Sequence, residues 1–161
     1  MPPVSRVLRA LALLVAAFAA VALAACGGED DREAKNDYVK QVNVAQNEFA
    51  ANVSTVSERI TSKSSSKEDR KTLEQFQAAI DDVVTDLRAI KVPDDVESEH
   101  KQLVGAMSGF GAEIKKATLA LRNPNSRTIA EAQRTIQAAT QTVNVRIDAA
   151  IAAINSKLKE S

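Results

Sequence analysis

The sequence is poor in the residues from which many functional sites are built. Its 161 residues include one Cys, one His, one Tyr, four Phe and no Trp. A lone Cys cannot form an intramolecular disulfide, and one Cys with one His cannot supply the four ligands of a structural zinc site. These shortages exclude a disulfide-stapled scaffold and a zinc-finger type of domain.

An excess of charge and the common catalytic motifs are also missing. The 21 basic and 21 acidic side chains give a formal net charge of zero, which argues against a whole-chain nucleic-acid binder. The sequence contains no G-x-x-x-x-G-K-[ST], no G-x-S-x-G and no H-E-x-x-H. Catalysis by a Ser/His/Asp set would have to use His100. We therefore expect no enzyme activity, no cofactor and no nucleic-acid partner.

The first 25 residues have the layout of a secretory signal. Residues 1–9 carry Arg6 and Arg9 and no acid, and residues 10–25 have no polar side chain. At about 16 residues the apolar run is shorter than the ~20 that a membrane-spanning helix needs. The pattern predicts a signal peptide, with a simple transmembrane anchor as the alternative.

The apolar run ends in Leu23-Ala24-Ala25-Cys26. This run resembles the lipobox of bacterial lipoproteins, which has an aliphatic residue, two small residues and then Cys. The resemblance implies that residues 1–25 are a signal peptide, cleaved between Ala25 and Cys26. It also implies a diacylglyceryl group on the sulfur of Cys26, which would hold the chain in membrane lipid at the outer face of the cell membrane.

The mature chain would then begin with a lipidated Cys and a short tether over residues 26–29. Loss of Arg6 and Arg9 leaves 19 basic against 21 acidic side chains, a net charge of −2. The Ala-rich composition and the signal region resemble those of actinobacterial lipoproteins. Because the tether is short, we expect a folded domain that lies close to the lipid surface.

Beyond the tether, apolar residues recur at steps of three and four in four segments. They predict helices over about residues 30–61, 67–91, 93–122 and 126–159. The second segment has a coiled-coil-like a/d seam formed by Leu73, Phe76, Ile80, Val83, Leu87 and Ile90. Four amphipathic helices with short turns predict an all-α, antiparallel up-down four-helix bundle over residues 30–161. A long helical hairpin that dimerises is the alternative.

Three local signals predict where these helices begin. Ser66 and Asp69 have the spacing of a capping box. Pro93 suits the first position of a helix, because no backbone N–H is needed there. The Asn123–Ser126 segment is a turn cluster before the last helix.

His100 is one candidate for a functional site. With Glu97 it forms an E-x-x-H spacing, which di-iron bundles use in pairs from two helices. The single His allows only one such pair, so we predict no metal site. We expect His100 to close the end of the core near Glu97 and Asp94. A single-metal role and a pH-sensing role are the alternatives.

Three glycines lie close together in the segment 93–122, namely Gly105, Gly109 and Gly111. Each should destabilise a helix interior by roughly 0.5–1 kcal/mol relative to Ala. The Gly105-x-x-x-Gly109 spacing predicts a close approach of the Ala-rich helix 126–159. A helix kink and a small-molecule cavity are the alternatives.

The pattern Tyr38-Val39-x-x-Val42-Asn43 with Val92-Pro93-x-x-Val96-x-x-x-His100-x-x-Leu103 resembles helical lipoproteins of actinobacteria that have no assigned activity. The sequence thus predicts a membrane-anchored extracytoplasmic lipoprotein. We expect it to be a non-enzymatic structural or protein-interaction module of the cell envelope, with an envelope protein as partner. The alternative is a ligand-binding or sensing bundle, with a site near Gly105–Gly111 or at His100.

Overall fold

The computed structural model describes residues 29–57 and 65–160, and these form four α-helices without a strand. The helices are α2 (Glu29–Ser57), α3 (Ser66–Ala89), α4 (Glu97–Ala120) and α5 (Ser126–Glu160), and a 3-10 turn, η2 (Asp94–Val96), precedes α4. The predicted all-α helical bundle is confirmed. The predicted signal peptide, Ala25, Cys26 and the expected end of the first helix near residue 61 lie outside the described residues.

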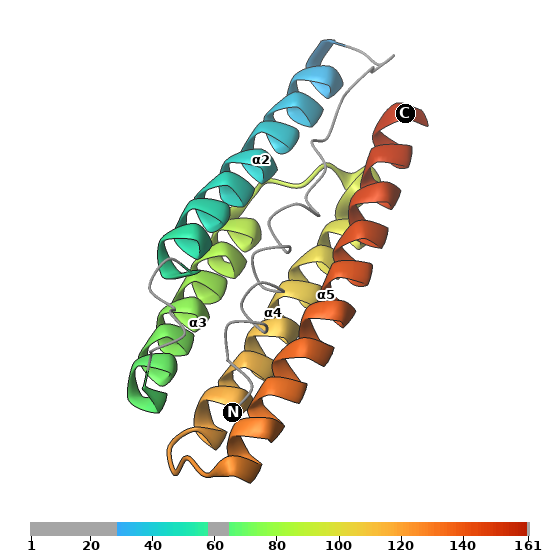
Figure 1. Cartoon of the computed structure of the whole chain (residues 1–161). Helices are drawn as coiled ribbons and strands as arrows, with labels where there is room; N and C mark the ends of the chain where they lie inside the picture. The colour runs from blue at the N-terminus through green and yellow to red at the C-terminus, as the bar shows by residue number, and fades with distance from the viewer. Residues whose placement is uncertain (1–28, 58–64, 161) are drawn as a thin grey trace.

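The helices are arranged as two antiparallel hairpins, α2 with α3 and α4 with α5 (Figure 1). Each helix packs against the next one along the chain, most extensively α4 against α5. Within the described ranges α2 and α5 hardly touch. The start of α2, η2 and the end of α5 lie at the same end of the bundle, which we call the η2 end (Figure 1).

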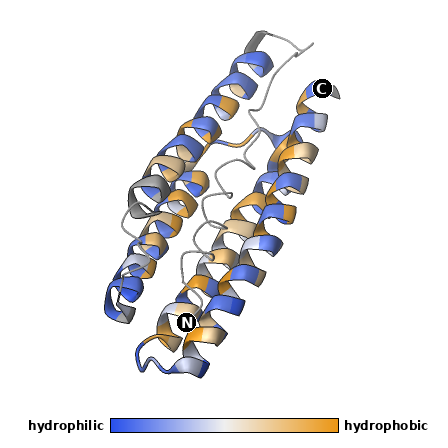
Figure 2. Ribbon diagram, viewed as in Figure 1, coloured by the Kyte–Doolittle hydropathy of each residue, from blue (hydrophilic) through white to orange (hydrophobic). Residues whose placement is uncertain are grey.

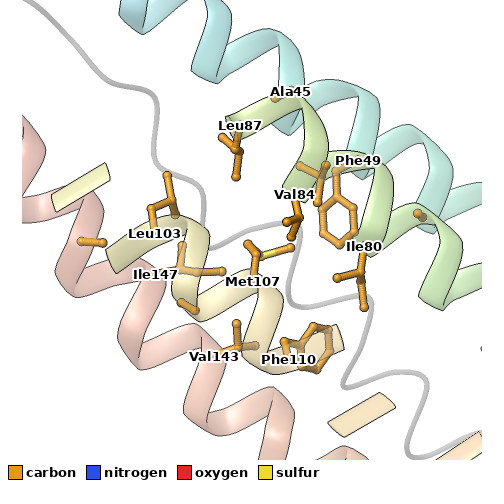
Figure 3. Packing of buried hydrophobic residues seen from close by; sticks show 14 of the residues in the cluster. Ala45, Phe49, Ile80, Val84, Leu87, Leu103, Met107, Phe110, Val143 and Ile147 are labelled. Carbon is orange, nitrogen blue, oxygen red and sulfur yellow. The ribbon is translucent and has the colours of Figure 1, made fainter. Parts of the chain in front are cut away.

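Buried apolar residues of all four helices form one core. Hydrophilic and hydrophobic colours alternate along each helix in Figure 2, as expected of amphipathic helices. The largest side chains with almost no exposure are Tyr38, Phe49, Ile80, Leu87, Leu103, Met107, Ile114, Ile147, Ile154 and Leu158. Figure 3 shows Met107 between Val84 of α3 and Ile147 of α5. The stripes read from the sequence are therefore the core positions.

Three Phe rings connect α2, α3 and α4 within this core. The ring centroids of Phe49 and Phe76 are 6.3 Å apart, and those of Phe76 and Phe110 are 5.8 Å apart in an edge-to-face arrangement. Both separations lie in the range that aromatic pairs prefer. Phe76 is the central member, because its ring meets one ring from each neighbouring helix.

The capping box of α3 is one residue earlier than predicted. Ser65, not Ser66, is the N-cap, and Glu68, not Asp69, is its partner. The backbone N–H of Ser65 donates to Glu68 Oε2 at 2.7 Å, and the backbone N–H of Glu68 donates to Ser65 Oγ at 3.4 Å. Glu is longer than Asp by one methylene and reaches back to the cap, whereas the Asp69 side chain is buried.

Pro93 does not begin the third helix as expected. Its backbone is extended, with φ −62° and ψ 144°, and its carbonyl accepts from the N–H of Val96 at 3.1 Å. The tight η2 turn that results brings Val96 into the core with no exposed surface. The α-helix itself begins only at Glu97.

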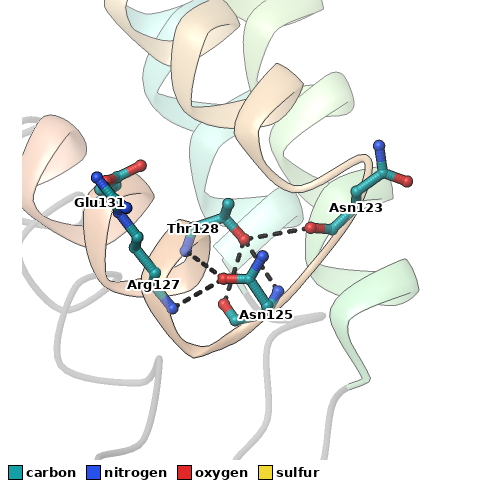
Figure 4. A network of polar contacts seen from close by, with 5 residues as sticks. All are labelled: Asn123, Asn125, Arg127, Thr128 and Glu131. Atoms are coloured by element: carbon teal, nitrogen blue, oxygen red, sulfur yellow. Dashed lines mark hydrogen bonds and ion pairs between the residues drawn. The ribbon is translucent and has the colours of Figure 1, made fainter.

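An Asn cap, which the turn cluster did not specify, starts α5 (Figure 4). Asn125 Oδ1 accepts from the backbone N–H groups of Arg127 and Thr128, each at 3.0 Å. In return the N–H of Asn125 donates to Thr128 Oγ1 at 2.9 Å. Side-chain acceptors of this kind satisfy the N–H groups that have no partner inside the first helical turn.

Candidate functional site

His100 lies at the η2 end and links three helices. It is 5% exposed, and its Nε2 lies 2.9 Å from the carbonyl oxygen of Leu87 at the end of α3. Its Nδ1 lies 3.1 Å from the hydroxyl of Tyr38 on α2. Because a carbonyl can only accept, Nε2 carries the hydrogen. In the neutral ring Nδ1 then accepts from the Tyr38 hydroxyl.

The surroundings favour the neutral forms of both rings. Burial lowers the pKa of His100, although the hydrogen bond to the Leu87 carbonyl opposes this effect. Burial raises the pKa of Tyr38, and the negative charge of Glu99 adds to the increase. Near neutral pH the pair is therefore an uncharged imidazole that accepts from a phenol.

Two ion pairs lie at the same end. Lys35 Nζ on α2 is 3.1 Å from Asp95 Oδ2 in η2, and Lys157 Nζ on α5 is 3.0 Å from Glu99 Oε1. The hydrogen bond from Lys157 is the main cause that lowers the pKa of Glu99. The other oxygen, Oε2, is buried and has no hydrogen-bond partner among the described residues. We call these groups the end cluster: Lys35, Tyr38, Asp95, Glu99, His100 and Lys157.

Glu97 does not join His100 in a shared site. Its side chain is exposed and binds Lys101 at 2.6 Å, and this contact lowers the pKa of Glu97. Over the part of the chain that the structure describes, no group of three or more His, Cys, Asp or Glu side chains could hold a metal ion. The two residues of the E-x-x-H spacing therefore act separately. Glu97 binds Lys101 at the surface, and His100 is hydrogen-bonded in the core.

The expected packing of Gly105 and Gly109 against α5 is wrong. Both are exposed, and a Cβ placed on either would have no heavy atom of the described residues within 4 Å. Each follows a core residue, Leu103 or Met107, by two positions, which rotates it by about 200° around the helix. Both glycines therefore point away from the core and from α5.

The close approach occurs at Gly111, and its neighbour is α3. A Cβ on this residue would lie 3.1 Å from Ile80 Cγ2 and 3.2 Å from Gln77 Nε2. Gly111 also forms part of the floor of an open groove of about 390 Å³ between α3 and α4. The walls of this groove carry Lys115 and Arg122 on one side and acidic side chains on the other.

Of the residues that the sequence offered for a ligand site, only Gly111 lines that groove. His100 is in the core, Glu97 is on the surface, and Gly105 and Gly109 face solvent. The described structure thus separates the residues that the sequence grouped into one possible ligand site. It joins His100 instead to Tyr38 and to a backbone carbonyl, neither of which the sequence had linked to it.

Nothing matches this chain among the protein-family models, the curated proteins and the solved structures with which it was compared. The chemistry of the site therefore has to be argued from its own residues. A buried neutral imidazole with both ring nitrogens hydrogen-bonded can hold helices together and can respond to protonation. It offers no vacant ring nitrogen to a substrate or a metal.

Proposed function

We propose that this protein is a membrane-anchored, extracytoplasmic lipoprotein with a non-enzymatic helical bundle that serves as a structural or interaction module of the cell envelope. The observation that carries the proposal is the position of Cys26. It is the chain's one Cys, it directly follows the apolar run 10–25, and α2 begins three residues later, at Glu29.

The architecture supports a defined orientation for such a protein. Since α2 begins at the η2 end, acylation of Cys26 would hold this end nearest to the lipid, and the turn between α4 and α5 would lie at the far end (Figure 1). None of the described helices is both long enough and apolar enough to cross a membrane. Two acyl chains hold a protein far more firmly than one, since each buried methylene adds ~0.8 kcal/mol.

The state of His100 supports a non-enzymatic role. A general base or nucleophile partner needs a nitrogen that can reach a substrate. Both nitrogens of His100 are engaged, by Tyr38 and by the Leu87 carbonyl, and the ring is buried. The remaining polar groups of the end cluster form ion pairs between elements of the fold.

The outer face of α5 supports a partner protein. An exposed, uncharged stripe with steps of four and three runs along it, formed by Ala138, Thr142, Val145, Ala149 and Ala152. Val145 is 70% exposed, the largest value among the exposed large hydrophobic residues. Uncharged residues at this spacing are typical of a face that packs against another helix. We therefore expect an envelope partner to contact α5 with a helix.

Metabolic labelling with an alkyne fatty acid tests the anchor. We expect the wild-type chain to be labelled and Cys26→Ala to lose all label. Ala25→Gly keeps a small residue before the cleavage point and should be labelled like wild type. Equal labelling of wild type and Cys26→Ala would show that the lipoprotein assignment is wrong.

Photo-crosslinking in intact cells tests the partner surface. A photoreactive residue at position 145 should give a discrete cross-linked protein, and the same residue at the exposed position 115 on α4 should not. The same products at both positions, or none at position 145, would contradict an interaction along α5. Labelling of Cys26 would be unaffected by either result.

A further inference from the structure

The end cluster is the place where α2 is tied to the second hairpin by polar contacts. The hydrogen bond from Tyr38 to His100 and the ion pair of Lys35 with Asp95 both run from α2 to the start of α4 and the turn before it. Along the rest of its described length α2 packs on α3 and hardly touches α5. These two contacts therefore add to the hold that the buried residues Val39 and Val42 give to the first turns of α2.

We propose that the end cluster is a pH-sensitive latch, in which protonation of His100 releases the first turns of α2 from the start of α4. The reason is the direction of one hydrogen bond. In the neutral ring Nδ1 accepts from the Tyr38 hydroxyl. After protonation Nδ1 carries a hydrogen, so the Tyr38 hydroxyl has to rotate and accept from the ring across the 3.1 Å contact, and it loses the acceptor for its own hydrogen.

The acids of the end cluster are Asp95 and Glu99, and of the Glu99 oxygens only Oε2 lacks a hydrogen-bond partner among the described residues. The ring of His100 contacts Tyr38 from α2 and the Leu87 carbonyl from α3. The charged groups of the end cluster are Lys35 from α2, Asp95 from η2, Glu99 from α4 and Lys157 from α5. The two carboxylates are each already bound to a lysine. A buried imidazolium would therefore be compensated only in part, which disfavours the closed latch.

The sign of the pH dependence follows from the pKa of His100, which burial lowers below the ordinary value of 6.5. Above pH 6.5 the ring is neutral in folded and unfolded chains, and the latch contributes its full stabilisation to the folded state. As the pH falls through the lower pKa of the folded state, this contribution is lost. The hydrogen bond from Lys157 lowers the pKa of Glu99 below the ordinary 4.5, so Glu99 keeps its charge above that pH.

The composition makes the test unusually direct, because the chain has one His and one Tyr. We would follow both rings by NMR in the full chain, without a polyhistidine tag, in detergent micelles between about pH 7.5 and pH 5. The Tyr38 signals should shift with the same midpoint as the His100 ring. Amide exchange over residues 31–42 should become faster by about tenfold, while the helix content stays constant.

Two variants make the outcome decisive. His100→Gln keeps a donor for the Leu87 carbonyl and an acceptor for Tyr38 but cannot be protonated, so the pH response of Tyr38 should disappear. Glu97→Gln, at an exposed position one turn earlier, should keep the response. The latch is wrong if Tyr38 and α2 exchange are unchanged while His100 titrates, or if His100→Gln still responds.

If His100→Gln does not fold, the comparison of the two ring titrations in the wild-type chain decides the question alone. The proposed lipid anchor plays no part in this experiment, since Cys26→Ala should show the same titration. The latch and the anchor can therefore fail independently.

Discussion

The three glycines of α4 differ in how much room a side chain would have. Gly105 and Gly109 face solvent in a helix interior, and neither has a positive φ. Their missing side chains destabilise the helix without improving the packing. Gly105→Ala or Gly109→Ala should therefore raise the free energy of unfolding by about 0.5–1 kcal/mol each, measured by urea denaturation.

Gly111 should behave in the opposite way. Its added methyl group would press on Ile80 Cγ2 at 3.1 Å, and the branched Ile80 side chain is buried and cannot turn aside easily. Gly111→Ala should therefore lower stability by about 1 kcal/mol, in spite of the better helix propensity. A gain equal to that of Gly105→Ala would show that α3 and α4 can separate slightly here without loss.

Tyr38→Phe isolates the hydroxyl of the end cluster. The ring remains in the core, but His100 Nδ1 becomes a buried acceptor without its donor. We expect a loss of about 1–3 kcal/mol at pH 7.5, from denaturant titrations of both chains. The same substitution in a His100→Ala background, which has no acceptor at this position, should cost less, because the two groups are coupled; equal losses in both backgrounds would contradict a direct interaction.

The outward position of two glycines and the shared end of Tyr38 and His100 could both be predicted from the sequence. Leu103, Met107 and Phe110 define the buried face of α4, and that face already excludes Gly105 and Gly109. Tyr38 and His100 are both on apolar stripes, near the starts of helices that run in the same direction, so they had to lie near the same end. Their hydrogen bond could not be deduced, since it depends on how far each helix is rotated.

At the scale of elements, the capping box of α3 gives a clear expectation. Ser65→Ala removes the hydroxyl that accepts from the backbone N–H of Glu68, and it should destabilise the fold by about 1 kcal/mol. Lys67→Ala, at an exposed position in the same turn, is the control and should have little effect. Thermal unfolding monitored by circular dichroism would measure both, and equal melting temperatures would argue against this register.

The pH dependence of this cap has its own sign. The backbone and side chain of Ser65 both donate to Glu68 and lower its pKa below the ordinary 4.5. The contribution of the cap is therefore present above that value and is lost as the pH falls through the lower pKa of the folded state.

The helix starts were less predictable than the helices. Consecutive Ser residues at 65 and 66 precede consecutive acids at 68 and 69, so the capping-box pattern fits in two registers. Likewise, Pro is compatible with the first helical position and with the residue before a turn. Tertiary packing decides both cases, since Asp69 and Val96 are buried in the registers that form.

At the scale of the whole molecule, the Phe layer joins one hairpin to the other. Phe76 of α3 meets Phe49 of α2 and Phe110 of α4. Phe76→Ala should lower the free energy of unfolding by about 3–5 kcal/mol, through lost burial and a cavity. Phe76→Leu keeps most of the volume and should cost less than half as much; equal losses would mean that the layer collapses without leaving a cavity.

The bundle as a whole was predictable, because four separate stripes leave few ways to bury them in one chain of this length. The unequal packing of the helix pairs was not. Nothing in the stripes shows that α2 and α5 stay apart over the described residues while α4 and α5 pack closely. α2 is therefore packed mainly on α3, and the contacts of the end cluster add to its hold.

The lengths of α4 and α5 determine how far their connecting turn lies from the η2 end. With 24 residues in α4 and 35 in α5, the hairpin extends about 36–53 Å from the η2 end to the turn capped by Asn125. Under the proposed anchoring at Cys26, the length of the bundle would set the distance between this turn and the lipid. Removing one heptad from each of the four helices would lower that height by about 10 Å and leave the end cluster intact.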